Sequence, residues 1–141
     1  MSADISYSAL VIESENASIR TAGGLISGNW YLWSNGTLGE SVSIPAAGTY
    51  EVVVRAYGSP LGDIWPEMEL SVDGVGVETV TVDSTEYVDY VFQVELTPGV
   101  HTIGVSFLND AYDPGVVDRS LYLDRFTIIS PPGVDKPELA P

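Results

Sequence analysis

The sequence predicts an all-β fold, an antiparallel β-sandwich or jelly roll. Apolar and polar residues alternate in several short runs, which is the period of a strand with one buried face. Turn residues separate these runs at regular intervals, as they do in sandwiches. No segment of the chain keeps the helical period over three turns.

Three runs show the strand period most clearly. They lie at residues 50–56, 101–107 and 121–128, and the last has a break in its alternation at Arg125. Each run predicts a strand whose apolar side chains point into a core while its polar side chains point outward. The apolar members are Tyr50, Val52, Val54, Ala56, Ile103, Val105, Phe107, Leu121, Leu123, Phe126 and Ile128.

Turn signals connect the predicted strands. Asp73-Gly74 lies between two apolar alternating segments and predicts a two-residue hairpin, because both residue types accept a positive φ. Residues 42–52 and 94–103 resemble each other, since each reads as strand, Pro/Gly turn and strand. We interpret both as hairpins within one sandwich.

Composition divides the chain into a body and a tail. Residues 131–141 are rich in proline and poor in apolar residues, which is typical of a linker. We therefore expect a β-sandwich module at residues 1–130, followed by a Pro-rich linker or tail. A body of this length buries enough surface to form a core without disulfides or a structural metal.

The charge of the chain narrows the possible partners. The formal net charge is −15, with one lysine and four arginines, so binding to nucleic acid or to an anionic membrane is not expected. Such acidity suits a cation, a neutral partner or a salty habitat. The absence of cysteine excludes disulfides, thiolate zinc sites and cysteine nucleophiles. No apolar run reaches the length of a membrane helix, and the N-terminus shows no signal-peptide pattern.

The sequence does not indicate an enzyme. Its one histidine, His101, shares the register of Ile103 and is expected to be a half-buried strand residue. The chain contains no hydrolase nucleophile elbow, no Walker loop and no paired-histidine zinc motif. Carboxylates are so numerous that a catalytic pair could be drawn almost anywhere, so their presence does not favour a glycosidase.

An acidic loop at residues 109–124 is the most informative segment. Asp110 and Asp118 bracket a turn at residues 113–115, so their carboxylates can approach each other from opposite limbs. A divalent cation would relieve their repulsion, and ligands that are all oxygen favour calcium over zinc. The spacing does not match an EF-hand. The alternative interpretation is a solvated hairpin tip, where Asp and Asn are common for turn reasons alone.

A second loop, at residues 58–67, combines an aromatic residue with acids. Asp63 and Glu67 flank Trp65. An indole beside carboxylates can hold a sugar, because the ring covers the apolar face of the sugar while the carboxylate oxygens bind the sugar hydroxyls. The alternative is that Trp65 closes the end of the sandwich, and Tyr57 and Tyr112 allow the same two readings. Elsewhere, Trp30 and Trp33 lie three residues apart and would face opposite ways on a strand.

Three segments, in this order, resemble one known family. They are residues 54–58, residues 66–74, and Asn109-Asp110 followed by residues 118–124. Together they are similar to the calcium-dependent xylan-binding carbohydrate-binding modules of family sixty, which are related to family thirty-six by circular permutation. Residues 12–17 are also similar to the opening of related β-sandwich modules.

The resemblance implies a jelly roll with one calcium ion exposed at its end, where sugar hydroxyls complete the coordination shell. By position, Asp110 and Asp118 correspond to ligands, and Asn109 corresponds to a residue that contributes a side-chain or backbone oxygen. Glu67 lies one position from the ligating glutamate of the family, whose slot Pro66 occupies. Trp65 and Tyr112 are the expected sugar-stacking residues, with Asp63 and Tyr57 as further sugar-binding residues.

We therefore expect a non-catalytic, calcium-dependent module for xylan or a related plant polysaccharide. It would be secreted, monomeric and part of a multidomain enzyme, which it would keep near its substrate. The main rival is a structural or adhesive β-sandwich domain of a larger secreted or surface protein, in which calcium only stiffens loops. A small glycosidase is the third reading.

Overall fold

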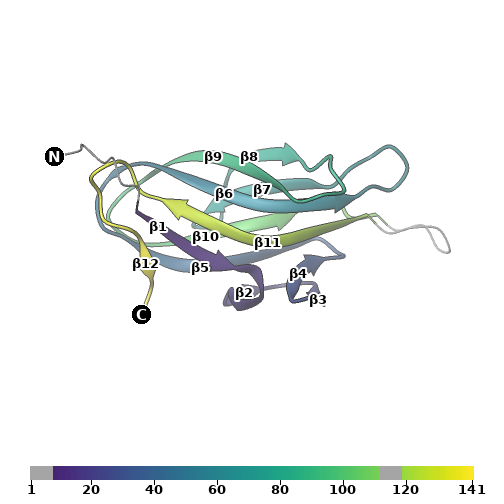
Figure 1. Cartoon of the computed structure of the whole chain (residues 1–141), viewed down its shortest axis with the longest axis horizontal. Helices are drawn as coiled ribbons and strands as arrows, with labels where there is room; N and C mark the ends of the chain where they lie inside the picture. The colour runs from purple at the N-terminus through teal and green to yellow at the C-terminus, as the bar shows by residue number, and fades with distance from the viewer. Residues whose placement is uncertain (1–7, 112–118) are drawn as a thin grey trace.

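The computed structural model describes residues 8–111 and 119–141, which form two antiparallel β-sheets packed face to face (Figure 1). The predicted all-β sandwich is therefore confirmed. The described part of the chain holds no helix with the length and hydropathy needed to cross a bilayer. One short 3₁₀ turn, η1, spans Ser14–Asn16.

Every strand pairing within the two sheets is antiparallel. The first sheet has the order β3-β4-β11-β6-β9, and β1 pairs with β11 beyond the end of β4. Its strands are β1 (Ala9–Glu13), β3 (Gly24–Ile26), β4 (Asn29–Leu32), β6 (Gly48–Ser59), β9 (Val88–Leu96) and β11 (Ser120–Ile129).

The second sheet has the order β12-β5-β10-β7-β8, and the short β2 also pairs with β5. Its strands are β2 (Ile19–Arg20), β5 (Gly36–Ile44), β7 (Glu67–Val72), β8 (Val75–Thr81), β10 (Gly99–Phe107) and β12 (Glu138–Leu139). Successive strands alternate between the two sheets along much of the chain.

The core lies between the sheets and follows the predicted alternation. In β6, Tyr50, Val52, Val54 and Ala56 are buried, because every second side chain of a strand faces the opposite sheet. Every apolar residue predicted for the three runs is fully or almost fully buried. The break in β11 is also confirmed, because its pairing with β6 shifts between Leu123 and Arg125. Asp124 is the extra residue of this bulge.

The predicted Asp-Gly hairpin joins β7 to β8. Asp73 has φ 53° and Gly74 has φ 81°, as the two central residues of a type I′ turn require. Asp73 also accepts a hydrogen bond from Thr102 N–H at 2.8 Å and lies 2.7 Å from Nδ1 of His101. His101 is mostly buried at the start of β10, so it fastens this turn to the neighbouring strand.

The interpretation of residues 42–52 and 94–103 as hairpins is wrong. The first segment leads from β5 in the second sheet to β6 in the first, and the second leads from β9 to β10 in the opposite direction. Both are arches that cross between the sheets at the same end of the sandwich. Their Pro/Gly signals correctly marked a reversal of the chain, but a turn signal does not specify which sheet the next strand joins.

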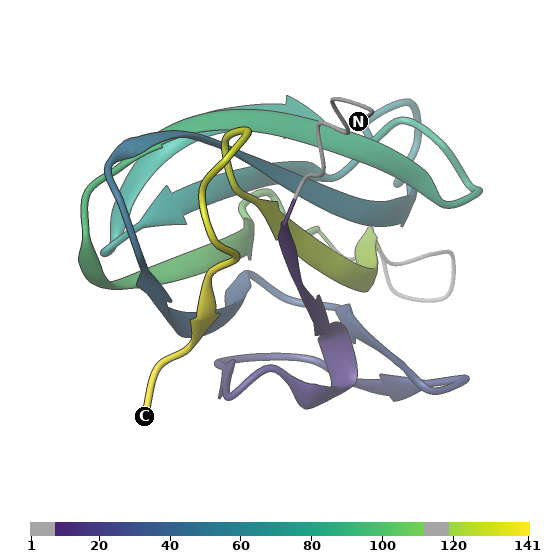
Figure 2. The same ribbon diagram turned by 60° about the vertical axis from the view of Figure 1, so that its left-hand side comes forward.

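Part of the predicted linker forms β12, an edge strand of the second sheet. Glu138 and Leu139 of β12 pair with Ser43 and Val42 of β5, and Figure 2 shows this yellow strand beside β5. Ser130 donates a hydrogen bond to the carbonyl of Asp135 at 2.6 Å. This bond closes a turn over the residues between them, before β12 begins. The chain after residue 130 therefore continues the sandwich as far as β12.

Candidate functional site

The candidate site lies at the end of the sandwich where β10 ends and β7 begins. We call residues 34–35, 60–67 and 108–111 the loop end. Because β7 and β10 are antiparallel neighbours, with Met68 opposite Phe107, the start of one strand lies beside the end of the other. Leu108 N–H donates to the carbonyl of Glu67 at 3.1 Å and extends this ladder into the loop.

Asn109 joins the two predicted loops through both ends of its side-chain amide. Its Nδ2 donates to the carbonyl of Trp65 at 3.0 Å, and its Oδ1 accepts from Glu67 N–H at 2.7 Å. The side chain therefore satisfies two backbone groups that no strand partner reaches. This junction sets the position of Glu67 relative to Asp110, which follows Asn109 directly.

Arg119 holds the same region in place through its guanidinium and its backbone. It is only 7% exposed, its Nε donates to the carbonyl of Ile64 at 3.0 Å, and its Nη1 donates to the carbonyl of Asn109. Its backbone N–H also donates to the carbonyl of Ala111 at 3.0 Å. Within the described ranges it forms no ion pair with a carboxylate. Backbone carbonyls, not acids, thus satisfy this buried cation.

Asp110 is held by its backbone and leaves its carboxylate exposed. Its N–H donates to Oδ1 of Asn35 at 2.7 Å, which ties it to the turn before β5. Among residues 8–111 and 119–141, no donor is hydrogen-bonded to the Asp110 carboxylate and no cation pairs with it. Glu67 is likewise exposed at the start of β7 and has no cationic partner there. Both acids are therefore available to a ligand.

The structure places the other predicted residues in different surroundings. Trp65 is half-buried beside the Asn109 junction, while Asp63 is exposed in a tight turn closed by mutual hydrogen bonds between Leu61 and Ile64. Tyr57 does not belong to the loop end. It lies on the outer face of the first sheet, with its ring centroid 4.2 Å from that of Tyr122.

Two predicted residues, Tyr112 and Asp118, fall outside the described residues. Asp118 belongs to the predicted ligand set, so the convergence of Asp110 and Asp118 stays a prediction. In the described ranges, no group of three or more histidines, aspartates or glutamates is placed to hold a metal ion. The side-chain oxygen and the carbonyl of Asn109 each already accept a hydrogen bond, which favours a positioning role for this residue.

Sequence reasoning did not identify Arg119 and Asn35 as functional residues. Arg119 is one of four arginines in a very acidic chain and directly precedes a buried strand, which is a detectable signal. Asn35 lies in a Ser-Asn-Gly segment, which by itself predicts only a turn. Its contact with Asp110 spans 75 residues of sequence, so only the fold reveals it.

Comparisons with known proteins indicate a carbohydrate-binding module. A sequence profile of the family CBM60, described as a calcium-dependent, xylan-binding carbohydrate-binding module, matches residues 51–138, which is more than half of the chain. No curated protein matches the chain in sequence.

Solved structures share the fold at low sequence identity. The CBM36-1 domain of a multidomain xylanase from the hindgut metagenome of Trinervitermes trinervoides has a TM-score of 0.70 and 18% identity, covering 89% of this chain and 99% of that one. A CBM36 module in complex with calcium and xylotriose has a TM-score of 0.62 and 22% identity, covering 86% and 99%. A ruminal GH26 endo-β-1,4-mannanase has a TM-score of 0.59 and 19% identity, covering 84% of this chain and 25% of the enzyme.

Proposed function

Because the chain belongs to the CBM60 family of carbohydrate-binding modules, we propose that it binds xylan without catalysis, through a calcium ion held at the loop end. Asp110, Asp118 and Glu67 would supply carboxylate ligands. The observation that carries the proposal is the Asn109 junction, which holds Glu67 and Asp110 on adjacent segments with exposed carboxylates that form no ion pair within residues 8–111 and 119–141.

The donor set at the loop end fits calcium. The available side-chain ligands are carboxylate oxygens, which hard cations prefer, and the chain has no cysteine to attract softer metals. Among the described residues, Arg119 is the one buried cation, and its guanidinium donates to backbone carbonyls instead of pairing with these acids. A bound calcium ion would offer open coordination positions to pairs of sugar hydroxyls.

Side chains around the ion would orient the sugar. Trp65 is half-buried beside the Asn109 junction, and a sugar ring would stack on its indole. Asp63, exposed two residues earlier, would accept hydrogen bonds from hydroxyls. We assign Tyr112 to the same role from the sequence. A shallow surface of this kind predicts weak affinity, about 0.1 mM for short oligosaccharides.

We further propose that the module belongs to a secreted, multidomain enzyme and acts as a monomer. Two observations support the link to an enzyme. One similar structure is a domain of a multidomain xylanase, and another similarity covers only a quarter of a mannanase. A module that holds such an enzyme on insoluble polysaccharide would raise its effective substrate concentration.

A depletion assay on insoluble xylan tests this function. We expect insoluble xylan to remove more protein from solution in calcium than with a chelator, and in calcium to remove more than cellulose does. Glu67→Gln keeps the shape of the side chain but removes its charge, and it should reduce depletion. Glu138→Gln, at an exposed acid on β12 near the opposite end of the sandwich, is the matched control. Equal depletion with and without the chelator would refute the proposed role of calcium.

A further inference from the structure

Five aromatic rings form a continuous row across the outer face of the first sheet. We call Trp33, Tyr31, Tyr122, Tyr57 and Tyr87 the aromatic ladder. Tyr122 of β11 lies directly opposite both Tyr31 of β4 and Tyr57 of β6 in the register. Their strand neighbours, such as Leu32 and Ala56, are buried between the sheets, so these tyrosines point outward.

The three central rings are stacked, and each terminal ring meets its neighbour edge to face. Tyr122 is parallel to Tyr57 at 4.2 Å and to Tyr31 at 5.1 Å, with interplanar angles of 5° and 9°. Trp33 meets Tyr31 at 4.9 Å and 60°, and Tyr87 meets Tyr57 at 4.7 Å and 85°. The central tyrosines therefore cover each other's faces, while the rings at the two ends face other directions.

Each terminal ring rests on protein on one side. A Cβ at Gly24 would lie only 2.8 Å from Cζ3 and 2.9 Å from Cη2 of Trp33, so this glycine makes room for the edge of the indole beside β3. Trp33 nevertheless stays 42% exposed, a large value for the largest apolar side chain. At the other end, the guanidinium of Arg55 lies 5.3 Å from the ring centroid of Tyr87. These supports hold both rings in place.

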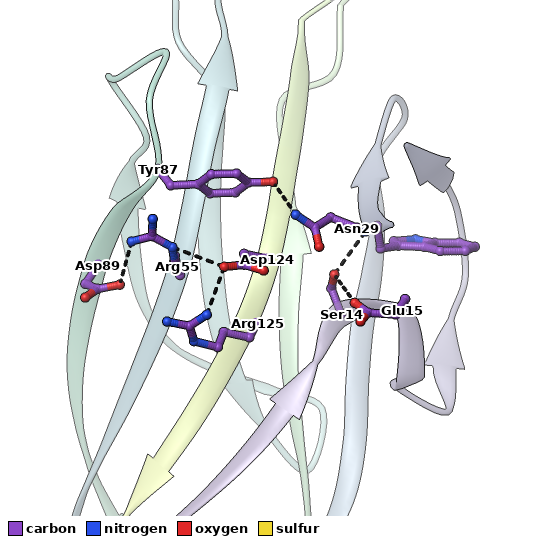
Figure 3. Close-up of polar contacts among 9 residues, drawn as sticks. Ser14, Glu15, Asn29, Arg55, Tyr87, Asp89, Asp124 and Arg125 are labelled. Carbon is purple, nitrogen blue, oxygen red and sulfur yellow. Dashed lines mark hydrogen bonds and ion pairs between the residues drawn. The ribbon is translucent and has the colours of Figure 1, made fainter. Parts of the chain in front are cut away.

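Planar polar groups lie around Tyr87, at one end of the ladder (Figure 3). Asn29 Nδ2 donates to the hydroxyl of Tyr87 at 2.9 Å, which joins β4 to the segment before β9. Oδ2 of Asp124 lies 3.1 Å from Nε of Arg55 and 3.0 Å from Nη1 of Arg125. Burial raises the pKa of Tyr87, so its phenol stays protonated at neutral pH.

The charges beside the ladder nearly cancel. Arg55 and Arg125 face Asp124, and Asp89 lies 3.8 Å from Arg55. Two cations thus meet two anions in a molecule whose net charge is −15. This local balance favours a neutral ligand that is rich in hydroxyl groups over a polyanion or a polycation.

The outer face of the second sheet offers a contrast. It carries small hydroxyl side chains that bond to one another, such as Thr37 with Ser106 at 2.7 Å and Ser41 with Thr102 at 3.2 Å. Gly39 and Gly104 lie opposite each other between these pairs. Aromatic residues are therefore concentrated on one face, which a structural role in a sandwich does not require.

We propose that the aromatic ladder is a second glycan-binding surface, which takes a linear, neutral polysaccharide chain across the strands and needs no metal. A sugar ring would stack on the exposed indole of Trp33, and hydroxyls of the next sugars would bond to tyrosine hydroxyls and to the polar groups beside them. This surface goes beyond the proposed function, because none of its residues belongs to the loop end, which Trp33 directly precedes.

The three tryptophans allow the two surfaces to be observed separately. Each gives one indole N–H signal in a ¹H–¹⁵N NMR spectrum, assigned by single Trp→Phe variants: Trp33 reports the ladder, Trp65 reports the loop end, and Trp30 is a control. Trp30 packs against the core and donates to the carbonyl of Ala22. With a chelator present, we expect xylohexaose or cellohexaose to shift the Trp33 signal while those of Trp65 and Trp30 stay in place.

Variants complete the test. Trp33→Ala should weaken the chelator-resistant binding about tenfold, as loss of a dominant contact residue does. Val100→Ala, at an exposed site on the second sheet, should leave it unchanged. A Trp33 signal that moves with neither sugar, or moves only with calcium, overturns the ladder surface but not the calcium site. A Trp33-dependent dimer in ultracentrifugation without sugar binding would instead identify the ladder as a self-association surface.

Discussion

Asn109 shows how one side chain can organise a site without touching a ligand. Its amide donates to Trp65 and accepts from Glu67, while its carbonyl accepts from Arg119. An asparagine provides a donor and an acceptor on one rigid plane, so no aspartate or leucine could replace it there. The sequence predicts a ligand at this position, and the hydrogen bonds favour a residue that holds the ligands in place.

One substitution separates these two roles of Asn109, and a second serves as its control. If Asn109 positions Glu67, Asn109→Asp loses the donor to Trp65 and should weaken calcium binding about tenfold, as loss of such supporting contacts does. If Asn109 were itself a ligand, the added charge of the aspartate would strengthen binding. Calorimetric titration with calcium distinguishes the two results, and Asn16→Asp on the exposed η1 turn provides the control.

His101 gives the fold a pH-dependent contact. The hydrogen bond to Asp73 raises the pKa of His101 above its ordinary value of 6.5, and bonds from Thr102 and His101 lower the pKa of Asp73. Nε2 of His101 also lies 2.9 Å from the carbonyl of Thr97, so the doubly protonated ring satisfies two acceptors. The raised pKa means that this stabilisation is complete below pH 6.5 and disappears as pH rises through the folded value.

His101→Gln should therefore lower the free energy of unfolding by about 0.5 kcal/mol at pH 5.5 and by much less at pH 9. Further acidification removes the same contact when Asp73 becomes protonated, below its ordinary pKa of 3.8. Urea unfolding at the two pH values measures the difference. An equal loss at both would mean that packing of the ring, not its charge, stabilises the turn.

At the scale of elements, the bulge in β11 places Asp124 between two arginines. The extra residue interrupts the alternation after Leu123, and the resulting carboxylate, 17% exposed, contacts both Arg55 and Arg125. Bulges commonly redirect a side chain in this way. Here the redirection provides a partner for two of the five basic residues in the chain.

Asp124→Asn should lower the free energy of unfolding by about 1–2 kcal/mol, because two guanidinium groups lose a shielded partner. Asp89→Asn is a matched control, since this carboxylate is 57% exposed and lies 3.8 Å from Arg55; its loss should cost less than about 0.5 kcal/mol. Denaturant unfolding of the two variants compares them directly. Similar values for both would contradict the importance of the bulge.

Local pattern predicts the strands and turns of this fold but not their partners. The alternation in β6 and the Asp73-Gly74 hairpin are both confirmed, because each depends on residues that are close in sequence. The arches before β6 and β10 were misread, since their turn residues do not determine the next sheet. The contact of Asp110 with Asn35 and the aromatic ladder depend on pairings of distant strands, which a single sequence does not reveal.

At the scale of the whole molecule, two faces and one end of the sandwich differ in chemistry. The loop end carries exposed acids, the outer face of the first sheet carries the aromatic ladder, and the outer face of the second carries small hydroxyl groups. The net charge of −15 adds a general attraction for cations that salt would screen. A specific calcium site must therefore show properties that charge alone cannot provide.

Thermodynamic coupling between calcium and sugar is such a property. If the ion bridges protein and glycan, xylohexaose must tighten calcium binding by the same factor by which calcium tightens sugar binding. Calorimetric titration of calcium, with and without xylohexaose, measures this factor in the wild type, in Asp118→Ala and in Asp135→Ala as a control. We expect tighter calcium binding with sugar in the wild type and the control, but not in Asp118→Ala. A calcium affinity that is the same with and without sugar would show that the ion only stabilises the fold and would contradict the proposed function.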